Sequence, residues 1–332
     1  MDDGSSLAPI RAAPAATRDP AAGPADVGLT DVVLTARELR LGVLSIIGAG
    51  LLFTTSHALI KLEGAYYPLV QLMFFRGFFA LIPLAPFLFR DGVAMLKTRR
   101  PGLHAARSLS GIVSMLCFFY ALTLLPLADV TAINFTMPLF VTALAVPLLG
   151  EKVGWRRWSA VLVGFSGILL MVRPGASVLD AAILIALASA FLYAVAVICM
   201  RRLGATERSA TTTFYFTLAC ALVGAALLPF YWVPPTPAGW VVLILVGLIG
   251  GTAQLLMTAG YRFAPAGIVA PFDYVSMVWA VLLGFLIWGD VPTAGIVGGA
   301  ALVIGSGLYI LYREQRVLRR PGGAPEARPK SP

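Results

Sequence analysis

Apolar residues along this chain fall into ten runs, separated by short segments that contain charged residues, glycine or proline. The runs cover approximately 39–60, 66–89, 104–125, 128–149, 156–172, 178–200, 211–230, 238–260, 266–288 and 293–312. Most are near the ~20 residues that a helix needs to cross ~30 Å of hydrocarbon, and the shortest still reaches ~17. Because a backbone in lipid must satisfy its own hydrogen bonds, this pattern predicts ten transmembrane α-helices.

One of these runs is repeated, together with the segment that closes it. Residues 126–151 read PLADVTAINFTMPLFVTALAVPLLGE, and residues 265–290 read PAGIVAPFDYVSMVWAVLLGFLIWGD, an offset of 139 positions. The offset pairs Pro126 with Pro265, Asn134 with Asp273, Gly150 with Gly289, Glu151 with Asp290 and, upstream, Gly111 with Gly250. A period near 140 residues in an apolar chain indicates two copies of one membrane module.

Each copy contains five spans, and because five is odd the second copy enters the membrane upside down relative to the first. We therefore expect an all-α integral membrane protein whose ten transmembrane helices form two inverted five-helix repeats, at 39–175 and 176–312. The tail 1–38 is rich in Ala, Pro, Gly and Asp, so we expect it to be disordered and not a signal peptide. The tail 313–332 is basic.

Composition supports a membrane protein. The chain is 59% hydrophobic and only 12% charged, with a mean hydropathy of +0.86, whereas soluble domains carry roughly 25% charged residues. The net charge of +9 would suggest nucleic acid in a soluble protein, but here the basic residues lie in short loops, so we expect a lipid bilayer and no nucleic acid as partner. Three cysteines inside apolar runs have no disulfide or metal spacing.

Lysine and arginine residues gather on one side of the ten spans. That side holds eighteen of them, Arg107 included, and the other side holds only Lys61 and Arg173. Because cytoplasmic loops carry an excess of positive charge, we expect both termini to be cytoplasmic in a multi-pass protein of the cell inner (plasma) membrane.

No motif in the chain indicates an enzyme. A P-loop, a glycine-rich dinucleotide turn and metal-ligand spacing are missing from the sequence, and its two histidines, His57 and His104, stand alone. We therefore expect neither a cofactor nor a metal nor an ATP-driven pump within this chain. Inverted repeats are a recurrent plan of secondary transporters, and the alternative from another class is a membrane receptor or accessory subunit that does not transport.

Four segments resemble the drug/metabolite transporter superfamily, in the branch built of two EamA-type domains. They are FFRGFFALIPL at 74–84, LPLADVTAINFTMPLF at 125–140, GEKVGWRRWSAVLVGFSGILLMVRP at 150–174 and APFDYVSMVWAVLLGFLIWGDVP at 270–292. The resemblance covers residues 39–312 and is closest to bacterial permeases of the S-adenosylmethionine and riboflavin type. It implies transport of a small molecule. By the same resemblance, the S-adenosylmethionine type carries a basic residue where this chain has Asp273, a departure that bears on the substrate.

Polar side chains at membrane depth are the candidate site residues, since a charge there needs a partner or a wet cavity. Asp273 either lines the translocation path, by cation binding or proton coupling, or forms a buried ion pair with Arg76 or Arg107. The resemblance implies an arginine at Arg76 whatever the substrate, so Arg76 either has a structural role or contacts substrate. Asn134, the counterpart of Asp273, serves either as a ligand or as a hydrogen-bonding contact between helices.

Further candidates could equally be packing residues. They are His57, Tyr120, Tyr193, Gln254, Tyr274 and Trp279. Glycines in the fifth and tenth spans indicate close packing, either between helices of one chain or in a homodimer; they are Gly164, Gly167, Gly295, Gly298 and Gly299.

The side chains expected around the cavity favour a planar, riboflavin-like heteroaromatic substrate. Flat apolar walls would come from Tyr120, Phe135, Tyr193, Tyr274 and Trp279, and offset stacking adds to area burial. The alternatives are S-adenosylmethionine or an amino-acid-like metabolite, imported or exported. A cationic solute such as S-adenosylmethionine would need an unpaired carboxylate deep in the membrane, and Asp273 is the candidate.

Overall fold

The computed structural model describes residues 36–92, 97–150, 154–172, 179–204, 206–207, 209–263 and 270–318. Every regular element in these ranges is a helix. The elements are α1 (Ala36–Glu63), α2 (Leu69–Asp91), α3 (Pro101–Leu124), α4 (Leu127–Asn134), α5 (Met137–Leu149), α6 (Trp155–Val172), α7 (Leu179–Gly204), α8 (Ser209–Tyr231), α9 (Pro237–Phe263), η2 (Ala270–Tyr274), α11 (Val275–Trp288) and α12 (Ala294–Leu318). The expected tails 1–38 and 313–332 lie mostly outside these ranges.

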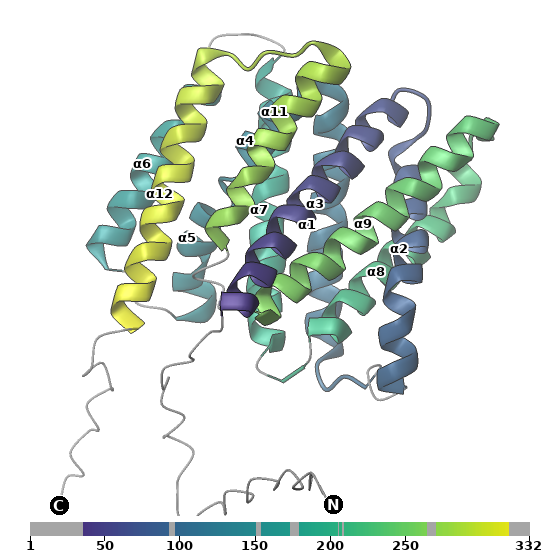
Figure 1. The fold of residues 1–332 in the computed structure, drawn as a ribbon, viewed down its shortest axis with the longest axis horizontal. Helices are drawn as coiled ribbons and strands as arrows, with labels where there is room; N and C mark the ends of the chain where they lie inside the picture. The colour runs from purple at the N-terminus through teal and green to yellow at the C-terminus, as the bar shows by residue number, and fades with distance from the viewer. Residues whose placement is uncertain are drawn as a thin grey trace, which may run out of the picture. The chain divides into compact units, whose positions relative to one another are not determined.

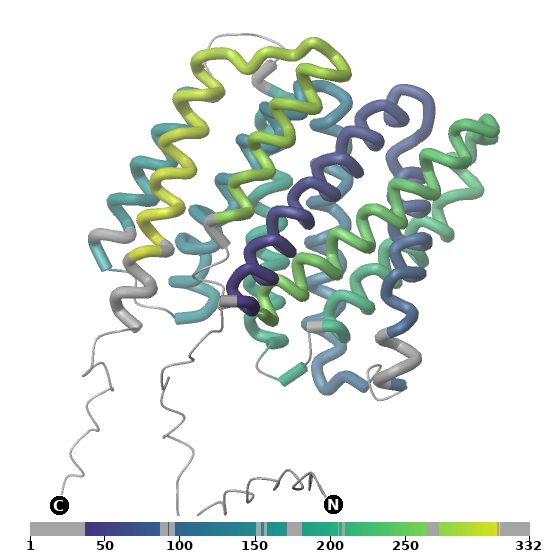
Figure 2. Tube along the Cα trace, in the orientation of Figure 1, coloured from purple at the N-terminus to yellow at the C-terminus, as the bar shows by residue number. Residues whose placement is uncertain are grey.

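The helices correspond to the ten apolar runs. Within the described part of the chain, seven segments are long and apolar enough to cross a membrane, and the fourth of these joins α4 and α5. Three shorter apolar helices, Trp158–Leu170, Phe272–Trp288 and Ala294–Ile310, account for the fifth, ninth and tenth runs. The first coloured turn of α1 and the last coloured turn of α12 lie toward the same end of the bundle, as an even number of spans requires (Figure 2).

Helix packing follows the repeat. The offset makes α7 the counterpart of α1 and α9 the counterpart of α3, and the structure packs α1 on α9 and α3 on α7. Two further contacts join a helix to its own counterpart, namely α2 to α8 and α6 to α12, and α4 packs on α11, the counterpart of α5. In Figure 1, α6 and α12 run side by side at one edge of the bundle, and α2, α8 and α9 lie at the other. This pairing is that of two five-helix repeats related by a two-fold axis.

The fourth and ninth spans differ from the single helices expected at 128–149 and 266–288. The fourth breaks at Phe135 and Thr136, where the amide of Thr136 donates to the carbonyl of Ile133 at 3.0 Å in a tighter turn. Pro138 has no N–H with which to continue the helical ladder to Asn134. In the ninth span the 3₁₀ turn η2, which contains Pro271, precedes α11. Both spans are thus irregular beside their central polar residue.

Glycines at equivalent positions end the two broken spans. Gly150 closes α5 with φ 68° and Gly289 closes α11 with φ 72°, both in the left-handed region where a side chain would be strained. The amide of Gly150 donates to the carbonyl of Val146 at 3.1 Å, and that of Gly289 to Phe285 at 2.9 Å. The sequence repeat is therefore also a repeat of backbone geometry.

Glycines of the fifth and tenth spans allow α6 and α12 to pack closely against each other. A Cβ at Gly167 on α6 would lie 2.8 Å from the carbonyl oxygen of Gly299 on α12, and a Cβ at Gly164 would lie 2.6 Å from Ser306 Oγ. A methyl group at either position would push α6 and α12 apart. Of the two uses left open by the sequence, the structure places these glycines at a contact between helices of one chain.

Candidate functional site

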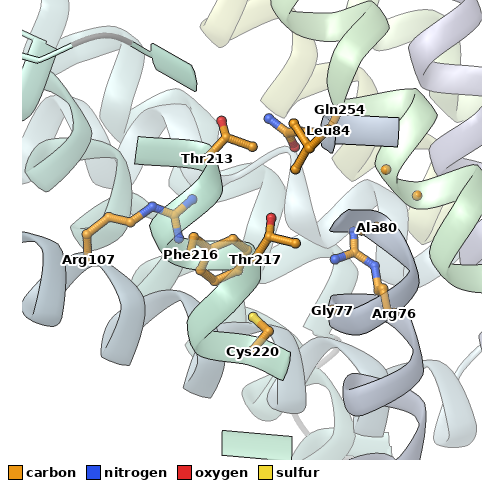
Figure 3. A pocket seen from close by; sticks show the side chains of 12 residues that line it. Arg76, Gly77, Ala80, Leu84, Arg107, Thr213, Phe216, Thr217, Cys220 and Gln254 are labelled. Carbon is orange, nitrogen blue, oxygen red and sulfur yellow. The ribbon is translucent and has the colours of Figure 1, made fainter. Parts of the chain in front are cut away.

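A small polar cavity lies between α2, α3, α8 and α9. Its volume is about 30 Å³, and its polar lining residues are Arg76, Arg107, Thr213, Thr217, Cys220 and Gln254. Figure 3 shows the two arginines approaching from opposite sides, with the α8 residues Phe216 and Thr217 between them. Space of this size holds about two water molecules.

Arg107 is the most enclosed charge of this cavity. Its side chain is 6% exposed, and its guanidinium carbon lies 3.8 Å from the centre of the Phe216 ring. Nη2 donates to the sulfur of Met200 at 3.6 Å, whereas Nε and Nη1 are buried and have no hydrogen-bond partner. Gly111, one turn along α3, leaves room for this arrangement, because a Cβ there would lie 2.7 Å from Nη1 and 2.8 Å from the ring.

Arg76 enters the cavity from α2 with similarly weak contacts. Its Nη1 donates to the sulfur of Met115 at 3.5 Å, its guanidinium carbon lies 6.0 Å from the Phe119 ring centre, and its Nε is buried without a partner. Gly250 on α9 borders this arginine, with a built Cβ 3.5 Å from Nε. The repeat-equivalent glycines Gly111 and Gly250 therefore each adjoin one arginine.

Neither arginine pairs with a carboxylate in the described part of the chain. The ion pair found there joins His104 and Glu207, so Asp273 forms no ion pair with Arg76 or Arg107. An uncompensated charge at membrane depth costs ~2.5–3.5 kcal/mol on insertion scales. A protein keeps such a charge where water or a bound ion of opposite sign can compensate it.

Asp273 lies on η2 at the irregular start of the ninth span. Its side chain is exposed, and its carbonyl accepts a hydrogen bond of 2.6 Å from Ser276 Oγ. Tyr193 on α7 lies near enough to Arg76, Arg107 and Asp273 to be influenced by their charges. It therefore links the cavity to the broken ninth span.

The two span breaks meet directly. The Phe135 and Tyr274 rings have centroids 4.8 Å apart with an interplanar angle of 54°. Asn134, half-buried, and Asp273 are the residues that immediately precede them. The structure thus brings the repeat-equivalent polar pair to the same part of the protein, as the repeat predicts.

Other predicted site residues are distributed differently. The His57 ring stacks on Phe53, with centroids 6.3 Å apart, and meets the Phe118 ring at a tilt of 57°, with centroids 4.7 Å apart. It is also close enough to Arg76 to be influenced by its charge. The indole Nε1 of Trp279 on α11 is buried without a hydrogen-bond partner. Tyr120 is not brought into the cavity. It is 46% exposed on the apolar stripe of α3 that also carries Leu109, Val113 and Leu124.

Some cavity residues were not singled out from the sequence. Arg107 was counted among the cytoplasmic charges and named only as a possible ion-pair partner of Asp273, whereas the structure buries it within α3 beside the cavity; the rule for charges at membrane depth could have found it, as it found Arg76. Nothing in the sequence marks Thr213 and Thr217 as cavity residues, since the hydroxyl of a threonine in an apolar helix usually donates a hydrogen bond to a backbone carbonyl of the same helix.

His104 does not stand alone, contrary to the expectation from sequence. Its Nε2 is hydrogen-bonded to Glu207, which also accepts hydrogen bonds from the Thr98 hydroxyl and, at 3.3 Å, from the Arg99 amide. Burial acts to raise the pKa of Glu207, but the hydrogen bonds from Thr98 and His104 outweigh it, so the pKa lies below its ordinary value. The cluster ties the α2–α3 segment to the α7–α8 segment.

Lys61, in the last turn of α1, also joins separate helical segments. Lys61 Nζ donates to the carbonyl of Leu125 at 2.5 Å and lies 5.2 Å from the centre of the Trp288 ring. Asp129 and Asp290 are near enough to interact with it electrostatically. The second half has a similar contact, in which Arg202 at the end of α7 donates to the carbonyl of Leu148 on α5.

Similar proteins are transporters. The S-adenosylmethionine uptake transporter of Rickettsia prowazekii (strain Madrid E) is 30% identical over 246 residues, covering 74% of this chain and 84% of that protein. The riboflavin transporter of Rhizobium johnstonii is 29% identical over 302 residues, covering 89% and 99%. The pseudopaline exporter of Pseudomonas aeruginosa (strain UCBPP-PA14) is 29% identical over 271 residues, covering 80% and 94%.

A solved structure and a family model extend the comparison. The crystal structure of another protein matches with a TM-score of 0.56 and 21% identity over 83% of this chain and 98% of its own, which shows a shared fold. The model of the EamA-like transporter family matches twice, at residues 40–173 and 180–312. The predicted family and the predicted fold are therefore confirmed: this chain belongs to the EamA-like transporter family and is a multi-pass membrane transporter built of two inverted repeats.

Proposed function

We propose that this protein is a secondary transporter of the cytoplasmic membrane, with both termini in the cytoplasm, which moves a small metabolite by alternating access. The observation that supports this most is the meeting of the two broken spans at Phe135 and Tyr274, beside Asn134 and Asp273. Irregular backbone at membrane depth is tolerated where it lines a cavity, and in inverted-repeat carriers it forms the substrate site.

A cationic metabolite of the S-adenosylmethionine type is the substrate that the described side chains fit best. Asp273 is exposed on irregular backbone and has no ion-pair partner among the described residues, which is what a cationic solute needs. Relatives from several Rickettsia species carry the name S-adenosylmethionine uptake transporter.

A riboflavin-like substrate is the second candidate. The unpartnered Nε1 of Trp279 could donate to a heteroaromatic ring, and a riboflavin transporter is among the relatives. The aromatic wall expected from sequence is only partly assembled, however. Phe135 and Tyr274 contact each other, and Tyr120 lies on an exposed stripe. This is why we place the riboflavin-like substrate second.

Flux into liposomes tests the proposal. Purified protein would be reconstituted, and uptake of labelled S-adenosylmethionine, riboflavin and amino acids compared with protein-free liposomes. Accumulation of S-adenosylmethionine that is lost with Asp273→Asn is expected. Flavin accumulation alone would reverse the order of the two substrates. Binding without flux of any solute would favour a receptor or accessory subunit.

A further inference from the structure

We propose that Arg76 and Arg107 form a carboxylate-binding subsite, so that the substrate carries a carboxylate in addition to any group held at Asp273. The inference rests on the proposed transport function and deepens it, because it names a chemical group that every good substrate shares. A zwitterionic amino-acid derivative has such a group, whereas riboflavin lacks it.

The first argument is the poor satisfaction of the arginine donors. A guanidinium has five N–H donors, and methionine sulfur is a weak acceptor. Each arginine has one sulfur contact and one aromatic ring, and three of their nitrogens, Arg76 Nε, Arg107 Nε and Arg107 Nη1, are buried with no partner. In an arginine with a purely structural role, we would expect these N–H groups to donate hydrogen bonds to carbonyl or carboxylate oxygens.

The second argument is electrostatic. Arg76 and Arg107 line one cavity, and the described residues supply no carboxylate within ion-pair distance of either. Two like charges around a low-dielectric cavity repel each other and raise the local affinity for an anion. The planar guanidinium matches a carboxylate through paired N–H donors.

The third argument is the size and surroundings of the cavity. At about 30 Å³ it has room for two oxygen-sized groups, too little for a whole metabolite. The hydroxyls of Thr213 and Thr217 and the amide of Gln254 add hydrogen-bonding groups around the same space. Tyr193 lies within electrostatic range of both arginines and of Asp273, so the remainder of a bound molecule would extend past Tyr193 toward η2.

The test compares ligands that differ only in the carboxylate. Purified protein would be titrated with S-adenosylmethionine and several amino acids, each beside its decarboxylated analogue, and with riboflavin, using ligand-induced thermal stabilisation and equilibrium binding. We expect at least one carboxylate ligand to bind ~tenfold or more tightly than its analogue, since hydrogen bonds to a charged group can supply that difference. Arg107→Gln and Arg76→Gln should each remove the preference.

Two further variants separate binding from folding. Arg107→Lys keeps the charge but not the forked donors and should retain part of the preference. Arg262→Gln, at the exposed cytoplasmic end of α9, should leave it unchanged. Because a variant could fail to fold, each must elute as a single species before titration, and the comparison within wild-type protein stands by itself.

The outcomes distinguish this inference from the proposed function. Equal binding of carboxylate ligands and their analogues, or binding of riboflavin alone, would overturn the subsite even if flux is observed. No binding of any carboxylate in the panel would also count against it. A clear carboxylate preference without flux in liposomes would support the subsite and overturn transport.

Discussion

Phe135 and Tyr274 are equivalent residues of the two repeats, and their rings touch with centroids 4.8 Å apart. When two residues related by a two-fold axis touch, that axis passes close to their contact. It therefore runs between the two broken spans and beside Asn134 and Asp273, which precede the rings in sequence. In the proposed alternating-access mechanism the two repeats exchange their arrangements, so we expect this contact to lie where their relative movement is smallest.

The Phe135–Tyr274 contact should be energetically coupled. In a double-mutant cycle with Phe135→Leu and Tyr274→Leu, we expect a coupling of ~0.5–1.5 kcal/mol, the amount that an aromatic pair adds beyond its buried area. Reversible unfolding in detergent, followed by circular dichroism, would measure it. Strictly additive effects would show that the rings are neighbours without a specific interaction.

Two equivalent glycines should respond differently to alanine. Gly111→Ala would place a methyl group 2.7 Å from Arg107 Nη1 and 2.8 Å from Phe216, whereas the nearest atom at Gly250 is 3.5 Å away, at ordinary contact distance. We expect Gly111→Ala to cost ~1–3 kcal/mol through overpacking and to weaken ligand binding, and Gly250→Ala to change both little. Apparent melting temperature and ligand affinity of the two variants check this, and equal effects would contradict it.

The sequence was sufficient to predict the spans and their grouping into two inverted repeats. Ten apolar runs correspond to helical segments, and the two glycines that the offset aligns, Gly150 and Gly289, end their helices with the same left-handed cap. Pro138 and Pro271 do not by themselves reveal how irregular the two spans are, because proline in a membrane helix can be accommodated by a kink or by a break.

The site was less predictable because its residues come from distant parts of the chain. Phe216 covers Arg107 across 109 positions of sequence, and no local pattern on α8 marks it as a cation-binding ring. Glu207 reaches His104 across 103 positions. Tyr120 was predicted to line the cavity because it is a polar aromatic residue at membrane depth, but the face of the helix on which it lies depends on neighbours that sequence does not reveal.

Acid should weaken the cluster around Glu207. Its hydrogen bonds hold the pKa below the ordinary value, so the carboxylate contributes stability that is fully present above the unfolded pKa of ~4.3 and is lost as pH falls through the lower, folded value. We expect wild type to have a higher melting temperature than Glu207→Gln above that unfolded value, and this advantage to shrink as pH falls below it. A difference independent of pH would show that the ionised carboxylate is not what stabilises the cluster.

Topology can be tested by reporter fusions at both sides of α7. Arg107 is buried and drops out of the positive-side count, but seventeen basic residues against two still favour cytoplasmic termini. A reporter after residue 175 should therefore be active outside, and one after residue 205 in the cytoplasm. Opposite results at both positions would contradict the proposed orientation.

Asp273 should be required for transport but not for folding. Its side chain is exposed on irregular backbone and has no ion-pair partner in the described residues, so Asp273→Asn removes a charge without leaving a buried cation unpaired. We expect the variant to insert and elute as one species while flux falls to the level of protein-free liposomes or becomes independent of a proton gradient. Asn134→Ala, at the equivalent position of the first repeat, is the matched control, since it removes a neutral amide and should leave partial flux. If Asp273→Asn aggregates and Arg76→Gln restores it, the two residues form an ion pair in another state of the transporter, and the role of Asp273 is structural.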